Sequence, residues 1–236
     1  MHGFIYPVET NGLMSIQNVL IVEDELLFRE YLVGWMKKEG YPAVREAASL
    51  AEAERMSVEE APDLVLLDMD LPDGEGLDYV ERQIKRKTTT RILVLTAHVA
   101  NYPVLRFKKS GVMGALDKGE TDGEVLRSAV EAVSQWKGYY SESVEKSFQK
   151  MVREPGAFYK KLSPREEEML KHFGCGYSNG EISVKLGISE ATVQGHRRNV
   201  MSKTGVRSTP ELIIWAMQNG FVLPKKLGRM EQRGSG

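Results

Sequence analysis

The sequence predicts two domains, an α/β domain built on a parallel sheet and a smaller all-helical domain after it. Short apolar runs alternate with helical patterns over the first half, and only helical patterns follow Gly138. The 236 residues, 42% of them hydrophobic, are enough for two cores of ordinary size. Residues 1–140 contain 16 Lys and Arg against 23 Asp and Glu, whereas residues 141–236 contain 16 against 10. This asymmetry suggests different partners for the two domains, with a polyanion for the basic one.

Five apolar segments in the first half are predicted to be strands that are covered on both faces. They are residues 18–22, 42–46, 63–68, 91–96 and 112–116. Apolar runs of this length are typical of parallel strands between two layers of helices. The candidate helices are residues 25–39, 49–59, 75–87, 100–109 and 122–136. This alternation predicts a (βα)5 doubly wound parallel sheet.

The second half is predicted to contain helices alone. Residues 141–153 have a helical pattern, and Pro155 and Gly156 make residues 154–161 a linker. Four short helices follow, each preceded by a serine that can cap it: Ser163, Ser178, Ser189 and Ser208. A glutamate stands three residues after the serine in three cases, which is the spacing of a capping box. The glycines expected to end these helices are Gly174, Gly187, Gly205 and Gly220.

Several classes of protein are disfavoured by the sequence. There is no run of about 18 uncharged apolar residues, so we expect no membrane span. The opening residues lack the pattern of a secretory signal, and Met14 is an equally good start. The lone Cys175 can form neither an intrachain disulfide nor a cysteine cluster for zinc. We therefore expect a cytoplasmic protein in which residues 1–15 are a leader or disordered.

Polar residues follow the predicted strands at the edge where an α/β sheet binds its ligands. The first strand ends in Glu23 and Asp24, the third in Asp68, the fourth in Thr96 and the fifth in Lys118. Three adjacent carboxylates repel one another, and a divalent cation with oxygen ligands, Mg²⁺, relieves that repulsion. Asp68 is then placed to attack phosphorus, with Thr96 and Lys118 bound to the phosphoryl oxygens.

Residues 16–137 resemble the receiver domain of bacterial two-component response regulators, which has a flavodoxin-like fold. The resemblance rests on VLIVEDE (19–25), LVLLDMDLPDGEG (64–76), LVLTA (93–97) and GALDK (114–118). It implies that Asp68 accepts a phosphoryl group from a sensor histidine kinase, with Thr96 and Lys118 as phosphoryl contacts. The implied magnesium ligands are Glu23, Asp24, Asp68 and the carbonyl of Met69. On this resemblance the domain is a switch and not a turnover enzyme.

The sequence departs from the receiver pattern at three positions. Ala115 stands where the family usually has Tyr or Phe, so the aromatic part of the family's switch is missing or supplied elsewhere. Gly119 replaces the frequent proline after the lysine, and no cis peptide bond is expected there. Asp70 adds a carboxyl two residues after Asp68, where it either alters the lifetime of the phosphoryl group or is a solvated loop residue.

A helix-turn-helix pattern lies in the basic half, where two short helices meet through Leu186-Gly187-Ile188-Ser189. Helical spacing places Val193, Val200 and Thr204 on the side of the second helix that packs on the first. The first helix and the turn offer Ile182, Leu186 and Ile188 as their partners. The opposite side carries residues suited to the major groove of DNA, namely Ala191, Gln194, Gly195, Arg198 and Ser202.

Residues 162–223 are similar to the LuxR-type (NarL/FixJ) DNA-binding domain, a four-helix unit whose third helix reads double-stranded DNA. The resemblance implies that Gln194, Gly195 and Arg198 face base edges. The residues expected to contact phosphates are Ser178, Lys185, Thr192, Arg197 and Lys203. The helix over residues 208–219, with Leu212, Trp215 and Ala216, is the implied dimer contact. Residues 138–161 are then a partly helical linker, and residues 224–236 a C-terminal tail.

These features favour a transcriptional regulator that is controlled by phosphorylation, binds promoter DNA and forms a homodimer when active. Two other hypotheses stay open. In one, the first domain is a dimerisation module that needs no phosphate. In the other, Asp68 and Asp70 are the nucleophile and acid of a Mg²⁺-dependent phosphatase.

Overall fold

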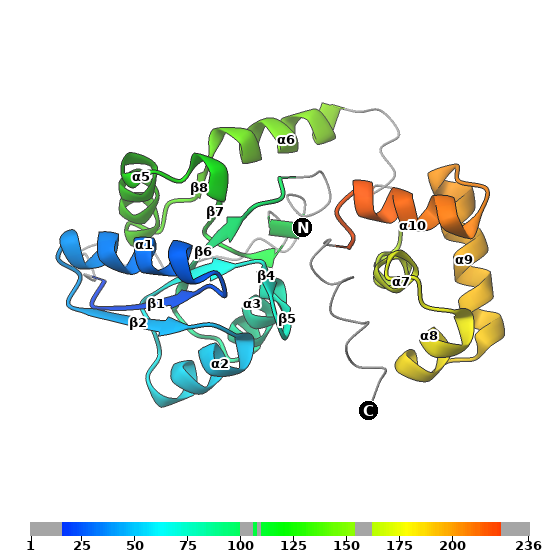
Figure 1. Cartoon of the computed structure of the whole chain (residues 1–236), viewed down its shortest axis with the longest axis horizontal. Coiled ribbons are helices and arrows are strands. Elements are labelled where there is room, and N and C mark those ends of the chain that lie inside the picture. Colours follow the sequence, from blue (N-terminus) through cyan, green and yellow to red (C-terminus); the bar gives the residue numbers. More distant parts are fainter. Residues whose placement is uncertain (1–15, 100–105, 108–109, 154–161, 223–236) are drawn as a thin grey trace. The chain divides into compact units, whose positions relative to one another are not determined.

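The computed structural model describes residues 16–99, 106–107, 110–153 and 162–222 (Figure 1). The described chain forms two compact units that divide after Glu145, and each unit is described by itself. Among the described helices, none is both long enough and apolar enough to cross a membrane.

The first unit contains a six-stranded sheet in which every neighbouring pair of strands is parallel. The strand order is β2-β1-β3-β6-β7-β8. Their bounds are β1 Asn18–Val22, β2 Ala43–Ala47, β3 Leu64–Asp68, β6 Arg91–Thr96, β7 Gly114–Asp117 and β8 Tyr139–Tyr140. The first five strands overlap the five apolar segments, so the predicted doubly wound sheet is confirmed. A small antiparallel hairpin, β4 Asp70–Leu71 with β5 Gly74–Glu75, was not expected.

Helices cover both faces of this sheet, with α1 and α5 on one side and α2 and α3 on the other (Figure 1). Their bounds are α1 Leu26–Lys38, α2 Leu50–Glu59, α3 Gly76–Lys85 and α5 Gly123–Ser134. These agree with the predicted helices to within a few residues. Most of the helix predicted over residues 100–109 lies outside the described residues.

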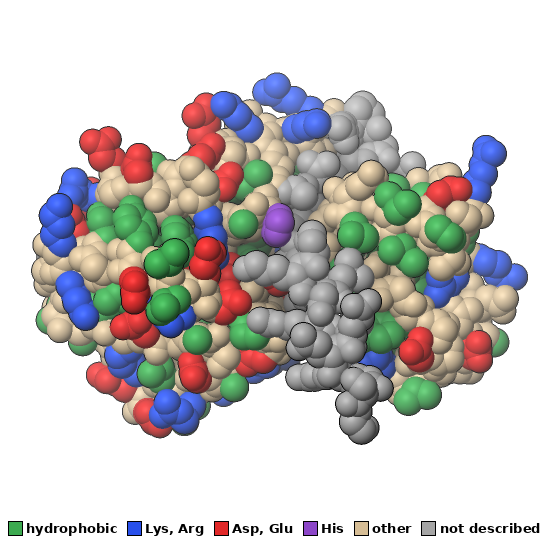
Figure 2. Space-filling view, in the orientation of Figure 1, with side chains coloured by type: hydrophobic (Ala, Val, Ile, Leu, Met, Phe, Trp, Pro, Cys, Tyr) green, Lys and Arg blue, Asp and Glu red, His purple; other side chains and the backbone are tan. Residues whose placement is uncertain are grey.

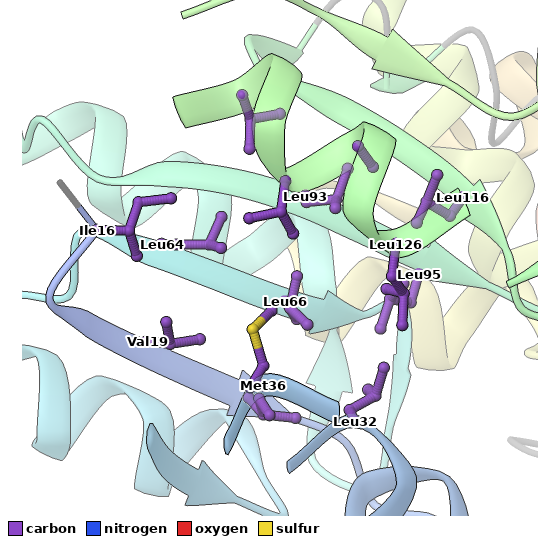
Figure 3. Packing of buried hydrophobic residues seen from close by; sticks show 14 of the residues in the cluster. Ile16, Val19, Leu32, Met36, Leu64, Leu66, Leu93, Leu95, Leu116 and Leu126 are labelled. Atoms are coloured by element: carbon purple, nitrogen blue, oxygen red, sulfur yellow. The ribbon is translucent and has the colours of Figure 1, made fainter. Parts of the chain in front are cut away.

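The core of the first unit packs α1 and α5 on the strands. Figure 3 shows Leu32 and Met36 of α1, with Leu126 of α5, beside Leu66 and Leu95 of the sheet. All five side chains are fully buried. Burying a leucine or methionine side chain stabilises a fold by about 1.5–3 kcal/mol. This packing fixes the sheet whose carboxyl edge carries the polar residues.

The expectation that no strand follows Gly138 was wrong, because β8 pairs with the edge of the sheet at β7. Two residues are too few to show a strand pattern in a sequence. Their approach depends on Gly114, since a Cβ there would lie 2.1 Å from the carbonyl oxygen of Tyr139. Helix α6, Glu142–Arg153, starts directly after this strand, within the helix predicted over residues 141–153.

The second unit contains the four predicted short helices. They are α7 Pro164–Gly174, α8 Asn179–Leu186, α9 Glu190–Thr204 and α10 Thr209–Gln218. Capping boxes form at Ser163 with Glu166 and at Ser178 with Glu181, and Ser189 caps α9, all as predicted. Ser208 caps α10, but the predicted capping box does not form there. Glu211 accepts its hydrogen bond from the Arg207 N–H and not from the Ser208 N–H. Such caps each stabilise a helix by about 1 kcal/mol.

The turn between α8 and α9 brings their apolar sides together. Val193 and Val200 of α9 are fully buried with Ile182 of α8, and Leu186 and Ile188 pack partly buried against them. Gly187 ends α8 with a φ of 63°, a left-handed conformation that glycine adopts without strain. The predicted helix-turn-helix packing is therefore confirmed.

Candidate functional site

Three carboxylates meet at the carboxyl edge of the sheet in the first unit. Glu23 and Asp24 follow β1, and Asp68 ends β3, the neighbouring strand. One carboxylate oxygen from each lies within 4.8 Å of the others. Glu23 and Asp68 are buried, and Asp24 is half-buried. A cluster of hard oxygen donors at this spacing fits a small divalent cation.

Lys118 supplies positive charge to this cluster. It is the first residue of the short 3₁₀ helix η1, Lys118–Glu120, which follows β7. Its Nζ lies 2.6 Å from Oε2 of Glu23 and 3.1 Å from Oδ2 of Asp68. The lysine side chain is only 12% exposed, and its ammonium lies 5.1 Å from the centre of the Phe28 ring. The cation is therefore held among the carboxylates by charge and by an aromatic face.

Burial and crowding change the acidity of these groups. Burial, followed by the negative charge of Asp68, raises the pKa of Glu23 to about 7. Burial alone lowers the pKa of Lys118, but the charges of Asp68 and Glu23 outweigh it and raise that pKa above its ordinary value. Three carboxylates lie around the ammonium of Lys118, and a second cation would relieve the repulsion among them.

Two other predicted site residues have partners within the chain. Thr96 ends β6 beside the cluster, but its hydroxyl donates to the carbonyl of His98 and accepts from the His98 N–H. The Met69 carbonyl accepts the Gly76 N–H at 3.0 Å, which leaves its second lone pair for another ligand. Gly76 allows this close approach, because a Cβ there would lie 2.4 Å from the carbonyl oxygen of Asp68.

Residues that the sequence reasoning missed also shape the site. Phe28, in the first turn of α1, faces Lys118. Its position shortly after Glu23 and Asp24 in the sequence was the feature that could have predicted this contact. Ala115 is fully buried in β7, in register with Tyr140 of β8. Asp70 is 9% exposed in the β4–β5 hairpin. The hypothesis that it is a solvated loop residue was therefore wrong.

In the second unit, α9 presents a polar face. Ala191, Gln194, Arg198 and Ser202 are exposed, and Gly195 is half-buried. These are the residues expected on the side away from the packed valines. Figure 2 shows Lys and Arg side chains along the edge of this unit where α9 lies. A helix with such a face fits the major groove of DNA.

The predicted phosphate contacts divide into two groups. Ser178 and Thr192 are exposed at the N-terminal ends of α8 and α9, where backbone N–H groups also point outward, and Lys185 is exposed in the last turn of α8. Arg197 instead turns inward, because its Nε donates to Asn179 and its guanidinium lies 4.2 Å from the centre of the Phe173 ring. Lys203 contacts Glu166, a buried residue of α7, at 2.6 Å. Both cations therefore have partners within their own domain, which helix periodicity alone does not predict, and their role as phosphate contacts stays a prediction.

Comparison with known proteins identifies a family for each of the two units. Residues 19–131 match the family model of the response regulator receiver domain, and residues 160–216 match that of the luxR family of bacterial regulatory proteins. The chain is 32% identical over 191 residues to the oxygen regulatory protein NreC of Staphylococcus epidermidis. The aligned residues cover 77% of this chain and 87% of NreC. It is 29% identical over 223 residues to the transcriptional regulatory protein DegU of Brevibacillus brevis, covering 86% and 94% respectively.

Solved structures share the fold. RcsB from Salmonella enterica serovar Typhimurium, bound to a promoter in the presence of the phosphomimetic BeF3⁻, superimposes with a TM-score of 0.59 at 22% identity. That superposition covers 85% of this chain and 98% of RcsB. The acidic edge of the first unit and the helix-turn-helix of the second therefore belong to one known architecture. The chain is a member of the two-component response regulators that join a receiver domain to a LuxR-type DNA-binding domain.

Proposed function

We propose that Asp68 is the phosphoryl acceptor of this response regulator and that its donor is a sensor histidine kinase. The observation that carries the proposal is the contact of the Lys118 ammonium with the Asp68 carboxylate, beside Glu23 and Asp24. Asp68 alone among the three carboxylates ends a central strand of the sheet, with β1 on one side and β6 on the other. The sheet holds it rigidly, as a nucleophile requires.

The chemistry follows from this arrangement. An oxygen of the Asp68 carboxylate attacks phosphorus and forms an acyl phosphate, while the bond from phosphorus to the donor nitrogen breaks. The electron pair of that bond leaves with the histidine, which takes up a proton as neutral imidazole. Lys118 then offers its ammonium to a phosphoryl oxygen by a charge-assisted hydrogen bond. Thr96 contributes its hydroxyl once it releases the His98 loop.

Glu23, Asp24, Asp68 and the Met69 carbonyl are the proposed ligands of Mg²⁺. When bound, the ion screens the charge of the incoming phosphoryl group. The fit rests on the oxygen-only donor set and on the crowding of three carboxylates, while burial first and then the charge of Asp68 raise the pKa of Glu23.

We further propose that α9 reads promoter DNA in the cytoplasm and that the active species is a homodimer. Gln194, Gly195 and Arg198 face base edges, while Ser178, Lys185 and Thr192 bind phosphates. Leu212 and Ala216 are fully buried in the core of their own unit and are not available for a dimer contact, whereas the exposed side chain of Ile214 supports α10 as that contact. Two-fold symmetry then predicts half-sites about one helical turn apart.

Intact mass tests the acceptor. The full chain is incubated with acetyl phosphate and Mg²⁺, and the wild type is expected to gain the mass of one phosphoryl group. Asp68→Asn is expected to gain nothing, whereas Asp70→Asn keeps the gain. Failure of the wild type to gain mass would favour the phosphate-independent dimerisation module.

The phosphatase hypothesis has its own readout. Asp70 follows Asp68 by two residues and is 9% exposed, which is the observation that favours this hypothesis. Steady-state hydrolysis of a small phosphate ester that Asp70→Asn abolishes would support it. We expect no such turnover, because a regulatory switch needs a phosphoryl group that persists.

A further inference from the structure

A short segment after α5 attaches to the strand that leads to Lys118. Residues Tyr139–Ser143, here called the latch, comprise β8 and the start of α6. The Tyr139 N–H donates to the carbonyl of Met113 at 3.1 Å, and the Ser141 N–H donates to that of Ala115 at 3.0 Å. The latch thus extends the sheet by one parallel strand at the β7 edge.

Two serines of the latch bind the turn that carries Lys118. The Asp117 N–H donates to Oγ of Ser141 at 3.1 Å, and the Ser143 hydroxyl donates to Oδ2 of Asp117 at 3.1 Å. The Ser143 N–H also donates to Oε2 of Glu120 at 3.2 Å. Asp117 and Glu120 lie on either side of Lys118, so the latch holds both ends of its turn.

The strand beside the latch is shaped to receive it. Gly114 leaves the space that the Tyr139 carbonyl occupies, since a Cβ there would approach that oxygen to 2.1 Å. Ala115, next in β7, pairs in register with Tyr140, so the small side chain and the ring lie on the same face of the sheet. A larger residue at position 114 would therefore obstruct the latch.

We infer that the latch couples the state of Asp68 to the connector that leads to the DNA-binding domain. The inference rests on the proposed function. In the structure, Lys118 reaches both Glu23 and Asp68. A phosphoryl group on Asp68 draws the ammonium away from Glu23 and shifts the turn, which strains the two serine bonds to Asp117. The latch is released from β7, and the rest of α6, which follows the latch in the chain, is released with it.

The latch is weak enough to serve as a switch. A two-residue edge strand is marginal by itself, and three polar bonds at a partly exposed surface add little more. Allosteric couplings of ordinary size change affinities by about 5-fold or more. A ligand that favours the released state by that factor moves the population of the latch measurably.

Hydrogen exchange of the full chain tests the release. Amides of residues 139–145 are followed by mass spectrometry with Mg²⁺, with and without beryllium fluoride as a stand-in for the phosphoryl group. We expect their exchange to become at least about 5-fold faster when the fluoride is bound. Unchanged or slower exchange, with binding verified by calorimetry, would overturn the coupling.

The reverse effect is required by linkage. The double variant S141A/S143A opens the latch without phosphate, so it is expected to bind beryllium fluoride at least about 5-fold more tightly than the wild type. S141T/S143T keeps both hydroxyls and is expected to restore wild-type affinity. S134A serves as the control, because the Ser134 hydroxyl donates within α5, to the Glu131 carbonyl, and has no bond to the latch among the described residues. Unchanged or weaker binding by S141A/S143A would overturn the inference.

Acetyl phosphate separates the two failures. A wild type that gains no phosphoryl mass contradicts the proposed function and the latch together. A wild type that gains the mass, with unaltered exchange over residues 139–145, contradicts the latch alone.

Discussion

The ammonium of Lys203 lies 2.6 Å from Oε2 and 2.8 Å from Oε1 of Glu166, so the end of α9 is bound to the first turn of α7. Glu166 is almost fully buried and also accepts the Ser163 N–H at 2.7 Å in the α7 capping box. One carboxylate therefore serves a helix cap and an interhelical ion pair. The pair therefore joins the last turn of α9 to the first turn of α7.

Lys203→Ala is expected to destabilise the DNA-binding domain by about 1–2 kcal/mol, between the values for exposed and buried ion pairs. Urea unfolding measures the loss, with the exposed Arg207→Ala as a control that stays within about 0.5 kcal/mol. The slope of the salt dependence of DNA binding is expected to be the same for Lys203→Ala as for the wild type, because Lys203 is paired with Glu166. A slope reduced by about one with unchanged stability would instead identify Lys203 as a phosphate contact.

The same pair predicts how stability depends on pH. Burial tends to raise the pKa of Glu166, but Lys203 and the hydrogen bonds from Ser163 outweigh it and lower that pKa below 4.5. A carboxyl whose pKa is lower in the folded state stabilises the fold fully above its unfolded pKa and loses this effect as pH falls through the folded value. In urea unfolding near neutral pH, the wild type is therefore expected to have a larger free energy of unfolding than Glu166→Gln. This difference is expected to shrink below about pH 4. An advantage that grows in acid would contradict the pair.

Magnesium is expected to stabilise the receiver domain, because its three carboxylates are crowded in the fold and dispersed in the unfolded chain. At a Mg²⁺ concentration 100 times Kd the gain is about 2.7 kcal/mol, and a chelator removes it. Thermal unfolding with MgCl₂ or EDTA measures the effect. Asp24→Asn is expected to abolish it, whereas Glu30→Gln, an exposed charge change on α1, preserves it.

Arg198→Ala is expected to weaken binding to a selected operator by about 1–3 kcal/mol and to relax preference at one base position. Its side chain is exposed on the polar face of α9, so the fold does not need it. Lys185→Ala provides the contrast, with a uniform loss over all sequences and a shallower salt dependence. Equal losses on specific and random DNA for Arg198→Ala would remove it from the base readers.

Gly195→Ala separates helix propensity from DNA contact. A Cβ at this position meets no atom within 4 Å outside the helix backbone, so alanine is expected to stabilise α9 by about 0.5–1 kcal/mol. If the bare backbone approaches the bases, DNA affinity falls while urea stability rises. Unchanged affinity would show that the glycine has no part in recognition.

The sequence alone was enough to predict the doubly wound sheet, because continuous apolar runs such as residues 64–67 are stable only between two layers of helices. The meeting of Glu23, Asp24, Asp68 and Lys118 also followed from it, since parallel strands bring their carboxyl ends to one edge. Serine caps and the buried side of α9 are local patterns and were equally predictable.

Only the tertiary structure decided which polar side chains have partners inside the protein. Arg197 and Lys203 look like DNA contacts on a helical wheel, yet Asn179 and Glu166 bind them from helices 18 and 37 residues away. Strand β8 depends on the space left by Gly114. The hydrogen-bond partner of the Thr96 hydroxyl depends on the path of the loop that carries His98. Periodicity determines which face of an element is buried, whereas polar pairing depends on distances between elements, which only the folded chain defines.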